Sequence, residues 1–234
     1  MNYVFDGFTS ALKMLVTLDR EILTIILVSL KVCTASTLFA TLWGVPLGFG
    51  VANKDFWGKQ AVITVLNTLT AMPTVVVGLL MYALISRQGP VGSLGLLYTP
   101  WAMVMGQTIL IIPIIAALSL SAVQSVDKRV KKTALTLGAN RWQIAWMIFS
   151  EGKYALLAAI ITGFGRVFAE VGISMMVGGN IRGYTRNITT AIALETSKGE
   201  FALGLALGIV LLIVAFSINV LFHYFQQSSS LPHH

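Results

Sequence analysis

The stretch KRVKKTALTLGANRWQIAW, residues 128–146, carries five cations and no acidic residue, and it lies between two long apolar segments. Of the 234 residues in the chain, 56% are hydrophobic and only 11% are charged, whereas about a quarter of the residues in soluble domains are charged. This composition predicts an integral membrane protein rather than a soluble domain. The basic stretch is therefore expected to connect two membrane-spanning helices.

Five segments are apolar enough to cross the membrane, because a helix needs ~20 such residues to span ~30 Å of hydrocarbon. They are residues 22–51, 61–85, 96–122, 154–177 and 202–225. The sequence thus predicts an all-α membrane protein with five transmembrane helices in a single domain over residues 1–227. The remaining residues, 228–234, are interpreted as a tail that ends in a tag remnant.

An amphipathic helix is predicted ahead of the first span, because apolar residues recur there at helical spacing while charged residues lie off that face. The apolar residues are Val4, Phe5, Phe8, Leu12, Leu15 and Val16.

The distribution of Lys and Arg predicts the orientation, since these residues concentrate in cytoplasmic loops. The connection over residues 123–153 holds six cations against Asp127 and Glu151, so we place it in the cytoplasm. With five spans, the N-terminus is then outside and the C-terminus inside. The cations lie in short loops between apolar runs rather than along one stripe, so no nucleic-acid partner is expected and the bilayer is the expected surroundings.

Within the basic stretch, the pattern predicts a short helix that ends at Gly138 in a left-handed conformation and a second helix capped by Asn140. Ala134 and Leu137 are three residues apart and share a helix face. Either this face contacts a partner or the stretch is a solvated loop, and the residues alone leave both interpretations open.

Three prolines, Pro46, Pro73 and Pro113, fall inside expected spans, where we expect the helices to bend or break. Around Pro73 the polar side chains either line a solute path or pack against other helices. These side chains are Asn67, Thr68, Thr70 and Thr74.

The segment KTALTLGANRWQIAWMI, residues 132–148, resembles the EAA loop of permeases from binding-protein-dependent ABC importers. That loop reads Glu-Ala-Ala, three residues, Gly, nine residues, then Ile-x-Leu-Pro, and Ala134, Gly138 and Ile148 match it at the correct spacing. The resemblance implies a cytoplasmic coupling helix that docks into a separate ATPase.

The match is incomplete, because Lys132 and Thr133 replace the first two residues of the motif and Ser150 and Glu151 replace the last two. On this resemblance, the residues expected to contact the ATPase are Lys132, Thr133, Ala134, Leu137, Gly138 and Arg141.

Two further segments indicate which members of this family the chain resembles most. MPTVVVGLLMYALISRQGPVG, residues 72–92, looks like the second span of molybdate and tungstate permeases. FGRVFAEVGISMMVGGNIRGYTRNITTAIALETSKGEFALG, residues 164–204, resembles the tungstate branch. The resemblance implies ATP-driven import of an oxyanion, foremost tungstate, with molybdate or a sulfate-like oxyanion as the alternative.

The same resemblance implies a type I importer in a bacterial or archaeal cytoplasmic membrane, built from a homodimer of this chain, two ABC ATPase subunits and one external substrate-binding protein. ATP and Mg would bind the ATPase, since this chain has no Walker-type segment and no His or Cys cluster for a metal. No enzymatic activity and no cofactor are expected on the chain itself. A more distant alternative is a secondary transporter or channel that works without an ATPase, but five spans without an evident inverted repeat fit it poorly.

Arg166 lies twelve residues into the expected fourth span, where an isolated cation costs at least ~2.5–3.5 kcal/mol. Glu170, at i+4, is the expected partner. Either Arg166 faces the path and binds a passing oxyanion, or the pair fastens helices together. In the loop over residues 178–190, Asn180, Arg182 and Arg186 are the expected outer gate or binding-protein contact, with a flexible polar turn as the alternative.

Overall fold

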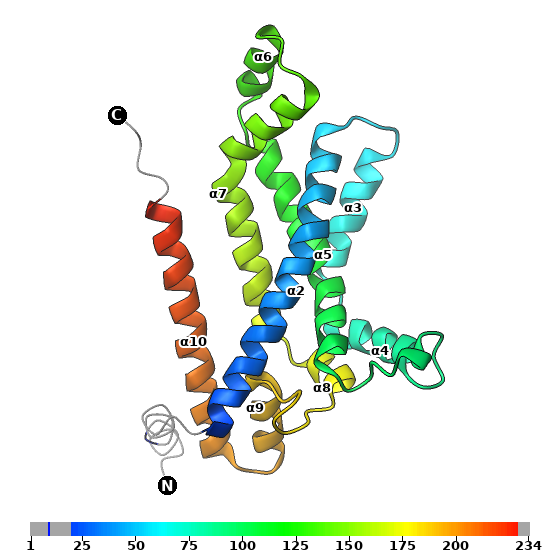
Figure 1. Ribbon diagram of the computed structural model, residues 1–234, viewed down its shortest axis with the longest axis vertical. Helices are drawn as coiled ribbons and strands as arrows, with labels where there is room; N and C mark the ends of the chain where they lie inside the picture. Colours follow the sequence, from blue (N-terminus) through cyan, green and yellow to red (C-terminus); the bar gives the residue numbers. More distant parts are fainter. Residues whose placement is uncertain (1–8, 10–19, 229–234) are drawn as a thin grey trace. The chain divides into compact units, whose positions relative to one another are not determined.

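The computed structural model describes residue 9 and residues 20–228 of the chain (Figure 1). The predicted amphipathic helix and residues 229–234 of the predicted tail lie outside this description. The described residues form helices and no strand, in the order α2 (Arg20–Asn53), α3 (Lys59–Thr70), α4 (Thr74–Ile85), η1 (Gly92–Leu94), α5 (Pro100–Gln124), α6 (Lys128–Thr136), α7 (Arg141–Phe168), α8 (Gly172–Gly178), α9 (Ile188–Ser197) and α10 (Phe201–Ser228).

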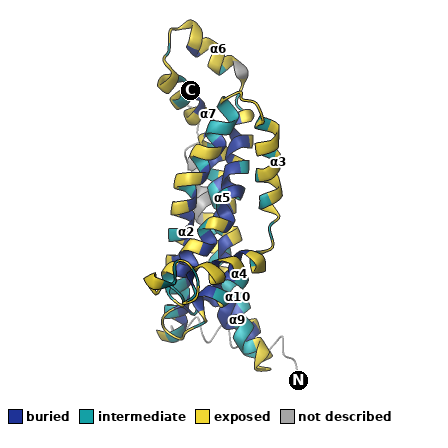
Figure 2. Ribbon diagram, turned by 90° about the vertical axis from the view of Figure 1, so that its right-hand side faces the viewer, coloured by how far each residue is buried: buried dark blue, intermediate teal, exposed yellow. Residues whose placement is uncertain are grey.

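Within the described residues, four helices are long and apolar enough to cross a membrane, namely α2, α5, α7 and α10. Helices α3 and α4 count as a fifth span only if the sharp bend between them is included. The predicted all-α architecture with up to five spans is therefore confirmed. Figure 2 shows α3 largely exposed, and none of its residues is buried within the chain.

The second span breaks at Pro73, which adopts φ −63° and ψ 126° directly ahead of α4. Proline disfavours helical geometry in the residue before it, and α3 ends at Thr70. The predicted bend or break is confirmed at this proline. Helices α2 and α5 continue through Pro46 and Pro113 without a break.

The expected end of the fourth span at residue 177 is wrong, because α7 runs from Arg141 to Phe168 and α8 is a separate helix. The chain leaves helical geometry between them, where the backbone carbonyl of Glu170 accepts a hydrogen bond from the Thr189 hydroxyl (2.8 Å). A long-range partner thus satisfies backbone that a continuous helix would have paired internally. Arg166 consequently lies in the last turn of α7, directly ahead of the break.

The chain divides into two units by its internal contacts. The first unit contains the residues up to Ser36 together with Pro73–Thr108 and the chain from Gly165 onward, and the second contains Thr37–Met72 and Ile109–Phe164. In the first unit, α4 packs against α8 and α9 packs against α10 (Figure 1). In the second, a Cβ on Gly48 of α2 would lie 2.2 Å from the Ala116 carbonyl oxygen of α5, so these backbones meet at a glycine, as membrane helices commonly do.

A buried polar network crosses the interior of the first unit. The amide of Gln107 in α5 donates to the hydroxyl of Ser174 in α8 (3.1 Å), and the amide of Asn187 donates to the same oxygen (3.0 Å). On the other side, the Ser36 hydroxyl of α2 donates to Gln107 Oε1 (3.0 Å). All four residues are at most 3% exposed, so the network ties α2, α5, α8 and the start of α9 together.

Replacing Asn187 with Ala is expected to destabilise the chain by ~1–3 kcal/mol or more, because the backbone N–H of Thr190 loses its cap and Ser174 loses a donor. Thermal unfolding of the detergent-solubilised protein, followed by tryptophan fluorescence, measures this loss. Asn219→Ala is the matched control, since the Asn219 side chain is exposed and bonds only within α10. Equal unfolding temperatures for the two variants would contradict a stabilising role of the network.

Candidate functional site

The junction between α6 and α7 in the second unit has the local geometry that its sequence predicts. Gly138 is left-handed at φ +76°. Its N–H bonds the Leu135 carbonyl (3.1 Å), and the Ala139 N–H bonds the Ala134 carbonyl (3.0 Å). These two bonds form a Schellman motif, which ends a helix by satisfying its last carbonyls. The predicted left-handed stop at Gly138 is confirmed.

The predicted cap at Asn140 is also confirmed. Its side-chain oxygen accepts from the Gln143 backbone N–H (2.9 Å), and the Gln143 side chain accepts from the Asn140 backbone N–H (2.8 Å). This reciprocal pair is a capping box, which fixes where α7 begins. At the other end of the junction, the Asp127 side chain caps α6 by accepting from the Arg129 N–H (2.8 Å). The α6–α7 junction is thus held by side-chain caps at both helix starts.

The apolar face of this junction differs from the expected one. Ala134 is 1% exposed and packs inside the chain, so its expected role in contacting a partner is wrong. Leu137 is 79% exposed and Leu135 is 55% exposed. Sequence reasoning missed Leu135 and the two tryptophans Trp142 and Trp146, which are 85% and 71% exposed on successive turns of α7. Their i,i+4 spacing was the available signal.

The cationic members of the expected coupling set, Lys132 and Arg141, are exposed around these apolar side chains, as is Thr133. Lys132 and Leu135 also line a hollow of about 710 Å³ that the 52–59 connection shares with α6. The junction therefore presents large apolar side chains surrounded by hydrated cations, which is a composition suited to contact with another protein.

The candidate path residues fall into both units. In the second unit, Asn67, Thr68 and Thr70 are exposed on α3. The hydroxyls of Thr68 and Thr70 bond to carbonyls of their own helix, at 2.8 and 2.6 Å. These residues are therefore exposed polar side chains on different sides of α3, and the hydroxyls of the two threonines already donate within the helix.

In the first unit, the structure brings Thr74 of α4, directly after Pro73, close to Glu170. A Cβ on Gly172 would lie 3.2 Å from the Thr74 hydroxyl oxygen and 3.3 Å from Glu170 Oε1. Glycine at this position therefore lets α4 and α8 approach with both polar groups in place.

Glu170 and Arg166 form the expected ion pair, with Arg166 Nη1 3.3 Å from Glu170 Oε2. The two side chains differ sharply in exposure, at 2% for Glu170 and 42% for Arg166. The other oxygen of Glu170 accepts the backbone N–H of Ile173 (3.2 Å) and so caps the start of α8. Glu170 therefore has a structural role at the helix break, whereas the Arg166 guanidinium offers further donors on its exposed side.

The three residues of the expected outer gate are held by one another and by a carboxylate. Glu21, near the start of α2, binds Arg182 through both oxygens and lies 3.7 Å from Arg186. Arg186 also donates to the Asn180 side chain (3.3 Å). Sequence reasoning missed Glu21, which is 161 residues from Arg182. The loop is therefore fastened to α2 rather than a freely flexible turn.

Comparison with known proteins identifies the class. Residues 44–230 match the family described as binding-protein-dependent transport system inner membrane component. The fold agrees with the solved structure of a bacterial ABC transporter involved in the import of the acidic polysaccharide alginate, with a TM-score of 0.76 at 18% identity, covering 97% of this chain and 84% of that chain.

Relatives with high identity span nearly the whole length. The tungstate uptake system permease protein TupB of Peptoclostridium acidaminophilum is 38% identical over 227 residues, covering 97% of this chain and 100% of that protein. TupB of Campylobacter jejuni is 39% identical over 228 residues, covering 97% and 95%. The chain belongs to the family of binding-protein-dependent transport system inner membrane components. Its predicted identity as a multi-pass transport subunit of an ABC importer, rather than an enzyme, is confirmed.

The different burial of Glu170 and Arg166 leads to different expected effects of their removal. Glu170→Ala should lower the unfolding temperature, because it removes the cap of α8 and leaves a buried N–H unpaired at ~1–3 kcal/mol. Arg166→Ala should also lower the unfolding temperature, because the buried carboxylate of Glu170 loses its cation, but it should leave assembly with the other subunits intact and abolish transport. Thermal unfolding, co-purification and uptake into proteoliposomes separate these effects. Loss of assembly in Arg166→Ala would instead assign a structural role to both residues.

Proposed function

We propose that this chain is the membrane-spanning subunit of an ATP-driven importer that carries tungstate across the cytoplasmic membrane. The observation that carries the proposal is the 38–39% identity, over 97% of the chain, to two proteins named as tungstate uptake permeases. Tungstate is a tetrahedral dianion, so its passage requires hydrogen-bond donors and positive charge without tight trapping. Arg166 is suited to this task, because its guanidinium is half-exposed beside a buried carboxylate.

The proposed coupling site is the α6–α7 junction. We assign contact with a separate ATPase to the exposed Leu135 and Leu137 and to Lys132, Thr133 and Arg141 around them. Gly138 and the Asn140 cap fix the angle between the two helices. A rigid junction between α6 and α7 transmits movement of the ATPase to α7, which ends at the Arg166–Glu170 pair. The ATP and Mg would bind the ATPase.

The proposed assembly is a homodimer of this chain with two ATPase subunits and one external binding protein. A second copy is needed because few spans are available to enclose a path, and the exposed polar side chains of α3 are suited to line one. The α6–α7 junction then faces the cytoplasm, with the N-terminus outside and the C-terminus inside. The Glu21–Arg182–Arg186 cluster would lie on the outer face, where the binding protein docks.

The proposal is tested by ATP hydrolysis of the complex in liposomes, assembled from this chain, its genomic ATPase and its binding protein. Tungstate is expected to stimulate hydrolysis at a lower concentration than molybdate or sulfate. If molybdate stimulates hydrolysis at a lower concentration than tungstate, molybdate is the cargo instead of tungstate. An assembled complex that no oxyanion stimulates would refute an oxyanion cargo.

Gly138→Val is expected to separate ATP hydrolysis from uptake or to prevent docking. A β-branched residue at φ +76° is strained by roughly 1–2 kcal/mol and should change the angle of the junction. No other atom of this chain lies within 4 Å of a Cβ at this position, so the Cβ itself meets no clash within the chain. Gly50→Val is the matched control, since its Cβ also meets open space but the backbone is helical. Uptake per ATP measures coupling, and a value equal to that of Gly50→Val would overturn the assigned role.

A further inference from the structure

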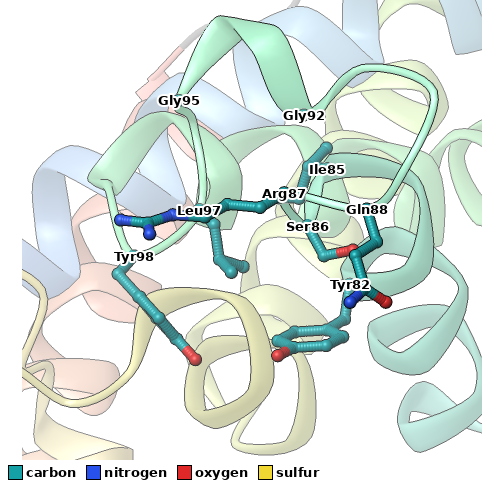
Figure 3. Close-up of a pocket in the computed structure, with 9 residues that line it drawn as sticks. All are labelled: Tyr82, Ile85, Ser86, Arg87, Gln88, Gly92, Gly95, Leu97 and Tyr98. Carbon is teal, nitrogen blue, oxygen red and sulfur yellow. The ribbon is translucent and has the colours of Figure 1, made fainter.

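The connection between α4 and α5 in the first unit forms a pocket of about 540 Å³ that the proposed path does not use (Figure 3). The pocket is lined by five side chains that can donate hydrogen bonds, which are Tyr82, Ser86, Arg87, Gln88 and Tyr98. None of the described residues that line it is acidic. Such a donor-rich, cationic lining is suited to an anion.

Arg87 supplies the positive charge of this pocket. Its side chain is exposed, and it forms no ion pair with any residue in the described ranges. Figure 3 shows its guanidinium extending toward Tyr98. This arrangement differs from Arg182 and Arg186, which both pair with Glu21, so that one of their two charges is offset.

The two phenols of the pocket face each other (Figure 3). The hydrogen bond with Tyr82 is the main cause that raises the pKa of Tyr98 above its ordinary value. A phenol whose pKa is at or above its ordinary value of about 10 is protonated near neutral pH, so Tyr98 is a hydrogen-bond donor. A ligand with several acceptor oxygens can accept a hydrogen bond from each hydroxyl, in place of the hydrogen bond between the two phenols.

The position of Tyr98 is set by an unusual backbone. Its φ is +63°, which is a genuine outlier for a bulky residue. The backbone N–H of Tyr98 donates to the Val177 carbonyl (2.9 Å), and a Cβ on Gly179 would lie 2.6 Å from the Tyr98 ring. Strained backbone of this kind persists only where the surrounding structure enforces it, and it gathers at functional sites.

The rest of the connection is also closely fixed. The Gly89 N–H bonds the Ser86 carbonyl (2.8 Å), and the Val91 N–H bonds the Leu84 carbonyl (3.1 Å). A Cβ on Gly92 would lie 2.2 Å from the Ser86 carbonyl oxygen. The donors of the pocket are therefore presented by an ordered loop, which lowers the cost of arranging them around a ligand.

We propose that this pocket is a weak outer binding site for a free tetrahedral oxyanion, held by Arg87 and by the hydroxyls of Tyr82, Tyr98 and Ser86. The inference rests on the proposed function, which supplies the oxyanion and puts this connection on the outer face. One cation against a dianion gives weak binding, so the ligand is released readily toward the path. A phospholipid phosphate offers the same acceptor oxygens, and exposed aromatic residues such as Trp101 often lie at lipid headgroups, so the test must separate the two sources.

The first measurement is equilibrium dialysis of tungstate against the permease–ATPase complex in phospholipid-free detergent, without the binding protein. The wild type should bind tungstate weakly, and Arg87→Gln should weaken binding about tenfold or more, because a charged hydrogen-bond partner is lost. Tyr98→Phe should also weaken it. Arg20→Gln is the matched control, since Arg20 is exposed, forms no ion pair among the described residues and lines none of the described pockets.

Three results of this measurement would overturn the inference. They are no binding by the wild type at millimolar tungstate, equal binding by all variants, and phospholipid that co-purifies with the wild type but not with Arg87→Gln while tungstate does not bind. The last result would assign the pocket to a lipid headgroup.

The second measurement is transport by the reconstituted importer with its binding protein. Arg87→Gln should lower the oxyanion carried per ATP and leave the affinity for the loaded binding protein unchanged, whereas Arg20→Gln should alter neither. If Arg87→Gln binds the loaded binding protein more weakly but carries as much oxyanion per ATP as the wild type, Arg87 is a contact for the binding protein and the inference is overturned. Full transport by Arg87→Gln would refute only the outer site, whereas a wild type that carries no oxyanion would refute the proposed function.

Discussion

The packing of the first unit depends on the hydroxyl oxygen of Ser174, because this oxygen accepts hydrogen bonds from both Gln107 and Asn187. In a lipid environment, apolar burial discriminates poorly between packing partners, since the lipid is as apolar as a leucine side chain. A buried amide, by contrast, is satisfied by few arrangements. The Ser174 junction therefore selects one packing of α5 against α8, and the apolar side chains fill the space around it.

The breaks between the short helices follow from the same constraint. Backbone polar groups in a membrane protein must be satisfied internally, and side chains do so at several of the helix starts. Glu170 caps α8, Asn187 caps α9 and Asn140 caps α7. Helix α4, by contrast, begins directly after Pro73 without a side-chain cap hydrogen bond. The buried carboxylate of Glu170 also forms an ion pair with Arg166 at the end of α7. Glu170 therefore serves both the fold and the candidate path.

Local signals were readable from the sequence, whereas long-range ones were not. Gly138 and Asn140 were predicted correctly, because a left-handed stop and a helix cap depend on residues within one turn. The end of α7 was missed, since hydropathy stays high through Val177 and the stabilising contact comes from Thr189, on another helix. Ala134 was misplaced for a related reason. Its spacing from Leu137 identifies a shared face but not which neighbour buries it.

The pairing of cations also depends on the fold, and it changes what the net charge of +7 means for an anion. Arg182 and Arg186 share Glu21, so one of their two charges is cancelled at short range. Arg166 keeps a half-exposed guanidinium beside one carboxylate, and Arg87 has no acid among the described residues. A dianion would therefore meet one uncompensated cation at Arg87 and one at the arginine-rich loop, and hydrogen-bond donors without net charge at the Arg166–Glu170 pair. Separated single charges lower the electrostatic barrier along a route without creating a site deep enough to retain the ion.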